Sequence, residues 1–211
     1  MVKGIAIYVE GGGDHHSTKT PFREGMSEFL RSIRDRARRR GVFWNVVPCG
    51  PRKEAYDKFQ KALENKPDWC NVLLVDSEEP VVDGRSAWEH LRHRKGDGRR
   101  RPADAGDEQC QMMVVCMEAW LLADPDGLAK HFGGRFDKSK LPPPDQAENR
   151  TKDAITVALR QATRDTPAGE YKKIRDGARL LAAVNPGTVR NCCTWCDRFF
   201  TMLEYTLGAA S

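Results

Sequence analysis

Short apolar runs rich in branched side chains recur through the first half of this chain, and amphipathic segments separate them. Runs of this kind are typical of strands buried on both faces, as in a parallel sheet. They cover residues 4–9, 42–48, 72–75 and 111–117. Between them, helical periodicity covers residues 22–40 and 52–64. The alternation predicts right-handed crossovers and an α/β fold with a mostly parallel sheet flanked by helices.

The last third of the sequence has a different pattern. Three consecutive prolines at 142–144 mark a break in the chain. The helical segments expected beyond it cover residues 153–164, 170–183 and 191–207. We therefore expect an α/β domain over residues 1–140 and a C-terminal helical extension over 141–211 that packs on it.

Composition limits the class of protein. The 211 residues suit one α/β domain with a small appendage, and the net charge of +5 permits an acidic partner such as nucleic acid. The lack of a membrane-length apolar run or a signal peptide predicts a cytoplasmic protein with no membrane association. Seven cysteines are interpreted as reduced thiols. Cys193 and Cys196 have half of a zinc-site spacing, but packing as small apolar side chains is the default interpretation.

Acidic side chains follow the ends of three apolar runs. Glu10 follows the first run, Asp76 and Glu78 follow the third, and Glu118 follows the fourth. The carboxyl ends of parallel strands meet at one edge of a sheet. On an extended chain Asp76 and Glu78 point the same way, and neighbouring carboxylates repel unless a cation or proton lies between them. The pattern predicts a site for a hard metal ion.

Structural interpretations of the same acids stay open. Asp76 could cap a following helix with the glutamates solvated, and Glu118 suits the first turn of a helix. If a metal is bound, carboxylate oxygens favour Mg²⁺ or Mn²⁺ over zinc. No Ser-His-Asp or Cys-His pattern supports a covalent acyl mechanism.

Two other segments are candidates for contact with a ligand. The glycines after Glu10 allow positive φ and close approach of the backbone to a ligand, although the spacing is neither a P-loop nor a dinucleotide fingerprint. A plain strand-to-loop turn is the alternative. Residues 94–102 are basic and rich in glycine, which predicts an exposed loop beside the acidic site. Such a loop favours a phosphodiester substrate, and a merely solvated loop is the alternative.

Glu10-Gly11 and Asp76-Ser77-Glu78 resemble the motif of the Toprim superfamily, in which a glutamate and glycine follow the first strand and Asp-x-Asp follows a later one. That superfamily includes catalytic domains of topoisomerases and primases and the OLD-type nucleases. Over most of its length the chain is similar to a family of small bacterial proteins of unknown function, encoded beside ATPases and linked with phage defence. The similarity lies in IYVEGGGD, LLVDSEEP, CMEAWLLADP and residues 23–26. Glu78 departs from the usual aspartate by one methylene.

The resemblance implies a Toprim-like fold and metal-dependent hydrolysis of phosphodiester bonds in DNA or RNA, by a phage-defence effector acting with an ATPase partner. Glu10, Asp76 and Glu78 would be catalytic and, with Glu118, would bind one or two Mg²⁺ or Mn²⁺ ions. With one metal, Glu10 is the candidate general acid or base. The candidate substrate-binding residues are Gly11, Gly12, Lys19, Arg23, Arg99 and Arg100, and Asp14 is a candidate support for the metal ligands.

Other function classes remain open. A Toprim-like module that binds a partner protein or nucleic acid without cutting is one alternative, and the departure at Glu78 motivates it. An enzyme that hydrolyses small phosphorylated molecules or transfers nucleotides with the same metals is another. The sequence also leaves open whether the chain forms a homo-oligomer.

Overall fold

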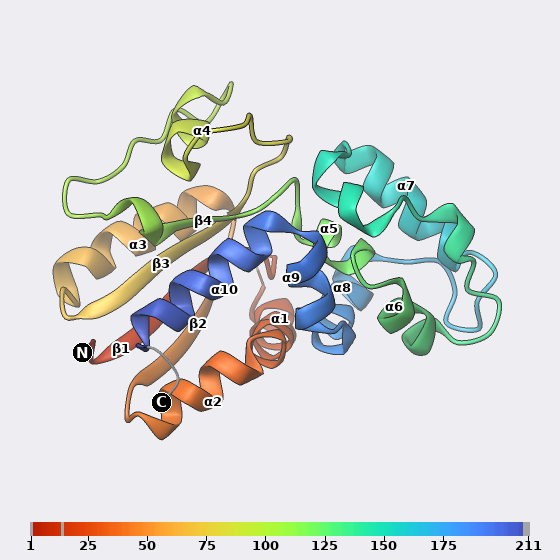
Figure 1. The fold of residues 1–211 in the computed structure, drawn as a ribbon, viewed down its shortest axis with the longest axis horizontal. Helices are drawn as coiled ribbons and strands as arrows, with labels where there is room; N and C mark the ends of the chain where they lie inside the picture. Colours follow the sequence, from red (N-terminus) through yellow and green to blue (C-terminus); the bar gives the residue numbers. More distant parts are fainter. Residues whose placement is uncertain (1, 14, 209–211) are drawn as a thin grey trace.

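Within residues 2–13 and 15–208, which the computed structural model describes, four parallel strands form the central sheet (Figure 1). The strands are β1 (Gly4–Glu10), β2 (Phe43–Gly50), β3 (Trp69–Asp76) and β4 (Cys110–Met113). They lie in the order β2-β1-β3-β4. The apolar side chains of the two central strands are buried on both faces, which is the burial that their unbroken apolar runs predict. The predicted α/β class with a parallel sheet and flanking helices is confirmed.

The fourth strand is shorter than the prediction over residues 111–117. The chain leaves the extended conformation after β3, because Glu78 has a φ of 68°. The ladder between β3 and β4 therefore ends at the pair Asp76 and Met113. Beyond that pair the Glu78 N–H still donates to the Val115 carbonyl at 2.7 Å, and the next helix begins at Met117.

Helices cover both faces of the sheet (Figure 1). They are α1 (His16–Phe29), α2 (Arg31–Arg39) and α10 (Thr194–Thr206) on one face, and α3 (Arg52–Asn65) and α4 (Ala87–His93) on the other. On the first face Phe29 stacks on Trp120, with ring centroids 5.4 Å apart, and meets Phe200 edge-on. On the other face Phe59 lies against Trp88. The crossover after β1 thus runs to one side and the crossover after β2 to the other.

Two predicted helices are each divided in the structure. The segment over 22–40 is α1 and α2, which meet at Leu30 (φ −94°, ψ 18°). The segment over 191–207 is the end of one helix and the start of α10, with Cys193 extended between them. Leu30 and Cys193 are both fully buried. Each break therefore lies in the core, where packing decides the backbone direction and periodicity alone does not.

The C-terminal helices pack on the sheet and on α1. The remaining helices are α5 (Met117–Leu122), α6 (Pro125–Phe132), α7 (Lys152–Thr163), α8 (Lys173–Ala183) and α9 (Pro186–Cys192), with 3₁₀ turns at Asp107–Gln109, Lys138–Lys140 and Pro144–Asn149. α8 lies so close to α1 that a Cβ on Gly25 would be 2.2 Å from the Ala178 carbonyl oxygen. One hydrophobic cluster extends from Ile5 in β1 to Leu207 after α10.

The cysteines are all free in the described part of the chain. Cys193 and Cys196 are fully buried in the hydrophobic cluster, as the interpretation of these residues as small apolar side chains predicts. Among the helices that the structure describes, none has the length and apolar character to cross a membrane.

Candidate functional site

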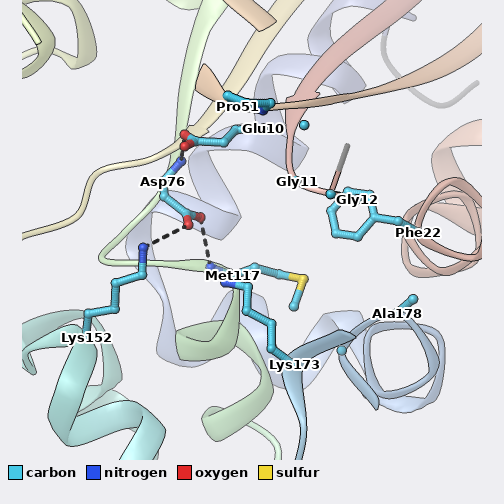
Figure 2. A pocket seen from close by; sticks show the side chains of 13 residues that line it. Glu10, Gly11, Gly12, Phe22, Pro51, Asp76, Met117, Lys152, Lys173 and Ala178 are labelled. Atoms are coloured by element: carbon cyan, nitrogen blue, oxygen red, sulfur yellow. Dashed lines mark hydrogen bonds and ion pairs between the residues drawn. The ribbon is translucent and has the colours of Figure 1, made fainter. Parts of the chain in front are cut away.

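A pocket of about 320 Å³ opens where the carboxyl ends of β1 and β3 lie side by side. Glu10 and Asp76, the last residues of these strands, both line it (Figure 2). The crossovers diverge between these two strands, and this switch point is where open α/β sheets bind ligands. The strand order therefore places two of the sequence-predicted acids at the expected binding crevice.

The carboxylate of Glu10 ties three strands together. Its Oε2 accepts hydrogen bonds from the Arg52 Nε at 2.9 Å and from the Asp76 backbone N–H at 3.1 Å. Arg52 begins α3 directly after β2. Glu10 therefore lies between a cation from one neighbouring strand end and a backbone donor from the other, in a geometry fixed by the sheet.

The Asp76 side chain is almost fully buried and turns away from Glu10 (Figure 2). Its Oδ1 accepts from the Met117 N–H at 3.1 Å, and its Oδ2 lies 3.7 Å from the Lys152 Nζ. Burial, followed by the charge of Glu10, raises the pKa of Asp76 to about 7, against the opposing charge of Lys173. A bound cation would reduce the repulsion between the negative charges at this position.

Glu78 reaches the same cluster by a different route from the predicted one. With a φ of 68° the backbone is not extended at this residue, so the argument that Asp76 and Glu78 point the same way along a strand is wrong. Glu78 instead accepts from the Lys152 Nζ at 2.7 Å and lies 3.4 Å from the Arg52 guanidinium. Burial opposes ionisation, but the hydrogen bond from Lys152 and the nearby positive charges lower the pKa of Glu78.

Glu118 lies in the first turn of α5 and is not among the residues that line the pocket. Its carboxylate is buried, accepts from the Tyr171 hydroxyl at 3.0 Å and pairs with the Lys173 Nζ at 3.0 Å. Burial and then the Glu118 charge raise the pKa of Tyr171, so the phenol stays protonated and donates. Burial lowers the pKa of Lys173, but the charges of Glu118 and Asp76 outweigh it and the net shift is upward. Glu118 thus holds Lys173 in position.

Two lysines that the sequence analysis missed complete the pocket. Lys152 and Lys173 are the first residues of α7 and α8, and both line the pocket on the side facing the strand ends (Figure 2). Burial opposes the positive charge of Lys152, but the hydrogen bond to Glu78 raises its pKa. No local pattern near either lysine marks it, because only the folding of the C-terminal helices over the sheet brings it to the site.

Arg52 is the third missed cation. It is 8% exposed, and its guanidinium donates to the Asp76 carbonyl and to the Asp97 carboxylate, both at 2.5 Å. A weak signal was present in the sequence, because Arg52 follows the second apolar run after only Cys49, Gly50 and Pro51.

The predicted substrate-binding residues separate into two groups. Gly11 and Gly12 line the pocket, with φ values of 129° and 81° that favour glycine. The others lie elsewhere. Arg23 donates its Nε to the Val46 carbonyl at 3.1 Å, and Arg99 pairs with Asp97.

Lys19 and Arg100 are also outside the pocket lining. The Lys19 backbone passes behind Gly12, with its Cα 3.4 Å from the position of a Cβ on that glycine. Arg100 lines a second pocket, beside α4. Asp14 lies outside the described residues.

The four predicted metal ligands are not gathered into one group. Among the described residues, no cluster of three or more acids, histidines or cysteines is arranged to hold a metal. Each of the four acids instead has a cationic partner: Arg52 for Glu10, Lys152 for Asp76 and Glu78, and Lys173 for Glu118. The donor chemistry at Glu10 and Asp76 nevertheless fits Mg²⁺ or Mn²⁺, since magnesium sites commonly use one or two carboxylates completed by water and substrate phosphates. Glu10 and Asp76 are the residues that would hold such an ion.

Comparisons with known proteins give a family but no activity. No curated protein and no solved structure matches this chain. A family model described as a domain of unknown function, DUF4276, matches residues 9–204. That description neither supports nor opposes the Toprim resemblance, which stays a prediction. Because the match covers nearly the whole chain, including both acids and both lysines of the pocket, the protein belongs to the DUF4276 family.

Proposed function

We propose that this protein is a metal-dependent nuclease that hydrolyses phosphodiester bonds in DNA or RNA. One observation carries the proposal: Glu10 and Asp76 end neighbouring parallel strands in one pocket, and Lys152 and Lys173 line the same pocket. Carboxylates at neighbouring strand ends suit a divalent ion, and lysines suit the phosphate that the ion would bind. The resemblance to Toprim nucleases supports the same reaction class.

Each group in the pocket has a definite role in this proposal. When bound at Glu10 and Asp76, Mg²⁺ or Mn²⁺ supplies a water of lowered pKa and neutralises charge on the leaving oxygen. Lys152 and Lys173 bind the non-bridging phosphate oxygens and orient the phosphodiester. Gly11 and Gly12 line the pocket without side chains, at φ values of 129° and 81°, so the substrate can approach the backbone closely. Arg52 holds Glu10 in place by its 2.9 Å hydrogen bond.

The setting of the reaction follows from the resemblance. We propose that the protein acts in the cytoplasm, as an effector of phage defence working with an ATPase partner. The supporting observation is the ordered similarity of IYVEGGGD, LLVDSEEP and CMEAWLLADP to proteins encoded beside ATPases.

A cleavage assay with isosteric variants tests the proposal. Purified protein is incubated with labelled DNA and RNA in Mg²⁺ or Mn²⁺, alone and with the ATPase. We expect Asp76→Asn and Glu10→Gln each to reduce the cleavage rate by at least about 100-fold, because each removes a charged metal ligand while keeping its shape. Glu79→Gln is the matched control, since Glu79 is an exposed acid of the same loop. Equal cleavage by Asp76→Asn and wild type would reject this active site.

A second candidate function has its own supporting observation. Glu78 and Glu118 are already paired with Lys152 and Lys173, an arrangement that a non-catalytic module binding nucleic acid or a partner protein would also satisfy. Isothermal titration distinguishes the two. Heat of Mn²⁺ binding that disappears in Asp76→Asn supports the nuclease, whereas nucleic-acid binding without any metal binding supports the module.

A further inference from the structure

A second pocket, of about 560 Å³, lies between α4 and the basic loop, residues 94–106. Three arginines line it: Arg92 from the last turn of α4, and Arg100 and Arg101 from the loop. The pocket also contains two acids, Glu89 and Asp107. The charge that it presents to a ligand therefore depends on which of these side chains already have partners.

Both acids are used within the fold. Glu89 accepts from the Ser86 backbone N–H at 2.8 Å, as the second half of the capping box at the start of α4. Asp107 lies 2.6 Å from the Arg101 guanidinium. Among the described residues, neither Arg92 nor Arg100 makes a side-chain ion pair or hydrogen bond. Two guanidinium groups therefore face the pocket with their donors available.

The basic loop is held in place and does not need to be ordered by a ligand. The Tyr56 hydroxyl of α3 donates to the Arg100 carbonyl at 2.7 Å, and the Arg99 guanidinium lies over the Tyr56 ring, 5.6 Å from its centroid. At the C-terminal end of the loop the Trp88 indole N–H donates to the Gly106 carbonyl at 3.2 Å. Binding to a fixed loop loses less conformational entropy than binding to a mobile one.

The same loop joins the second pocket to the candidate active site. The Asp97 side chain is fully buried and accepts from Arg52 at 2.5 Å, while Arg52 donates to Glu10. Residues 97–100 thus run from Asp97, which contacts the Arg52 that holds Glu10, to Arg100 in the second pocket. A nucleic-acid strand bound at both pockets would follow this segment.

We propose that the pocket formed by Arg92, Arg100 and Arg101 binds backbone phosphates of the nucleic-acid strand that is cleaved at Glu10 and Asp76. This inference rests on the proposed function for the identity of the ligand, and it assigns Arg92 and Arg100 as phosphate contacts outside the active pocket. Contacts of this kind would be independent of base sequence, because backbone phosphates carry no sequence information.

Fluorescence anisotropy in EDTA measures this binding without any metal-dependent cleavage. The probe is a fluorescein-labelled, mixed-sequence single-stranded DNA, with the matching RNA as a second probe. We expect the double variant R92A/R100A to bind about tenfold more weakly than wild type on several sequences alike. The slope of log K against log salt should fall in magnitude by roughly 1.4, since each phosphate contact contributes about 0.7 on a single strand.

The matched control is R38A/R39A, which removes the same charge from two exposed arginines of α2. Equal weakening by the two double variants, or an unchanged R92A/R100A with wild-type circular dichroism, would overturn the subsite. Displacement of the probe by polyglutamate as effectively as by unlabelled DNA would also overturn it, in favour of an acidic protein ligand. If the arginines contribute to binding but Asp76→Asn has no effect on cleavage, the nuclease proposal fails and the subsite stands.

Discussion

At the scale of single residues, Arg52 joins three segments that are far apart in the sequence. Its guanidinium contacts Glu10 at the end of β1, the Asp76 carbonyl at the end of β3, and Asp97 in the basic loop. Arginine suits this position because its planar group has five donors in a fixed arrangement. Removing one partner from such a buried pair leaves a charge without compensation, which typically costs about 3–5 kcal/mol.

Glu148 is a second residue whose charge is set by its surroundings, and it predicts a pH dependence of stability. Burial raises the pKa of Glu148 from 4.5 to about 7, although backbone N–H groups at the start of α10 oppose the shift. The folded protein therefore keeps a proton that the unfolded chain loses. The contribution of Glu148 to the free energy of unfolding therefore falls by at most about 3 kcal/mol as pH rises from about 4.5 to about 7. Above pH 7 it stays at this lower value.

The variant Glu148→Gln cannot ionise and isolates this effect. The free energy of unfolding of the variant minus that of wild type is the quantity to compare. We expect this difference to be about 2 kcal/mol larger at pH 8 than at pH 5. Urea unfolding at the two pH values measures the difference. Asp145→Asn is the control, because Asp145 is an exposed acid of the same 3₁₀ turn. A difference between Glu148→Gln and wild type that is independent of pH would contradict the prediction.

At the scale of elements, the approach of α8 to α1 decides where Lys173 lies. Gly25 is buried in α1 and leaves no room for a side chain against the backbone of α8. Phe22 of α1 and Ala178 of α8 then line the active pocket together. The helix contact thus shapes one wall of the pocket and sets the position from which α8 directs its first residue, Lys173, toward the strand ends.

Gly25→Ala tests this contact. The added Cβ would lie 2.2 Å from the Ala178 carbonyl oxygen, so the two helices must separate. We expect a loss of about 1–3 kcal/mol in the free energy of unfolding, despite the higher helix propensity of alanine. Gly134→Ala is the control, because a Cβ there meets nothing within 4 Å. Denaturant titration compares the two, and equal stability of both variants would show that the helices are not in close contact.

The elements themselves were largely predictable, and their ends were less so. Apolar runs located all four strands: β1, β3 and β4 are largely buried and therefore have few polar side chains, and the edge strand β2 is apolar although Phe43 is exposed. The helical pattern did not predict the breaks at Leu30 and Cys193, because both residues are apolar and continue it. The turn at Glu78 was not predicted either, because a positive φ in a non-glycine residue has no signal in the sequence.

At the scale of the whole molecule, the N-terminal and C-terminal parts share one core. Phe199 and Phe200 of α10 are fully or almost fully buried and contact Trp120 and Phe29, respectively. Removing α10 would expose these rings and the apolar surface of β4, which α10 covers. Aromatic side chains of this size make large contributions to stability when buried.

A fragment of residues 1–140 tests whether the predicted α/β domain is independent. We expect it not to unfold cooperatively and to bind a hydrophobic dye, because the fragment lacks the helices that cover Phe29 and Trp120. Near-ultraviolet circular dichroism and urea unfolding of the fragment and the full chain measure this. A sharp unfolding transition in the fragment, with native near-ultraviolet dichroism, would establish residues 1–140 as a domain in its own right.

The sequence by itself determined the α/β class, the parallel strands and the delivery of Glu10 and Asp76 to one edge. Burial is a local property of an apolar run, and the alternation of strands with crossover helices sets the parallel direction. Only the tertiary structure decided the cations of the site. Lys152 and Lys173 are separated from Asp76 by long stretches of sequence, and the packing of α7 and α8 over the strand ends brings them into the pocket. Acids at strand ends are placed by the direction of the strand, whereas these lysines are placed by contacts between helices, which no local pattern in the sequence encodes.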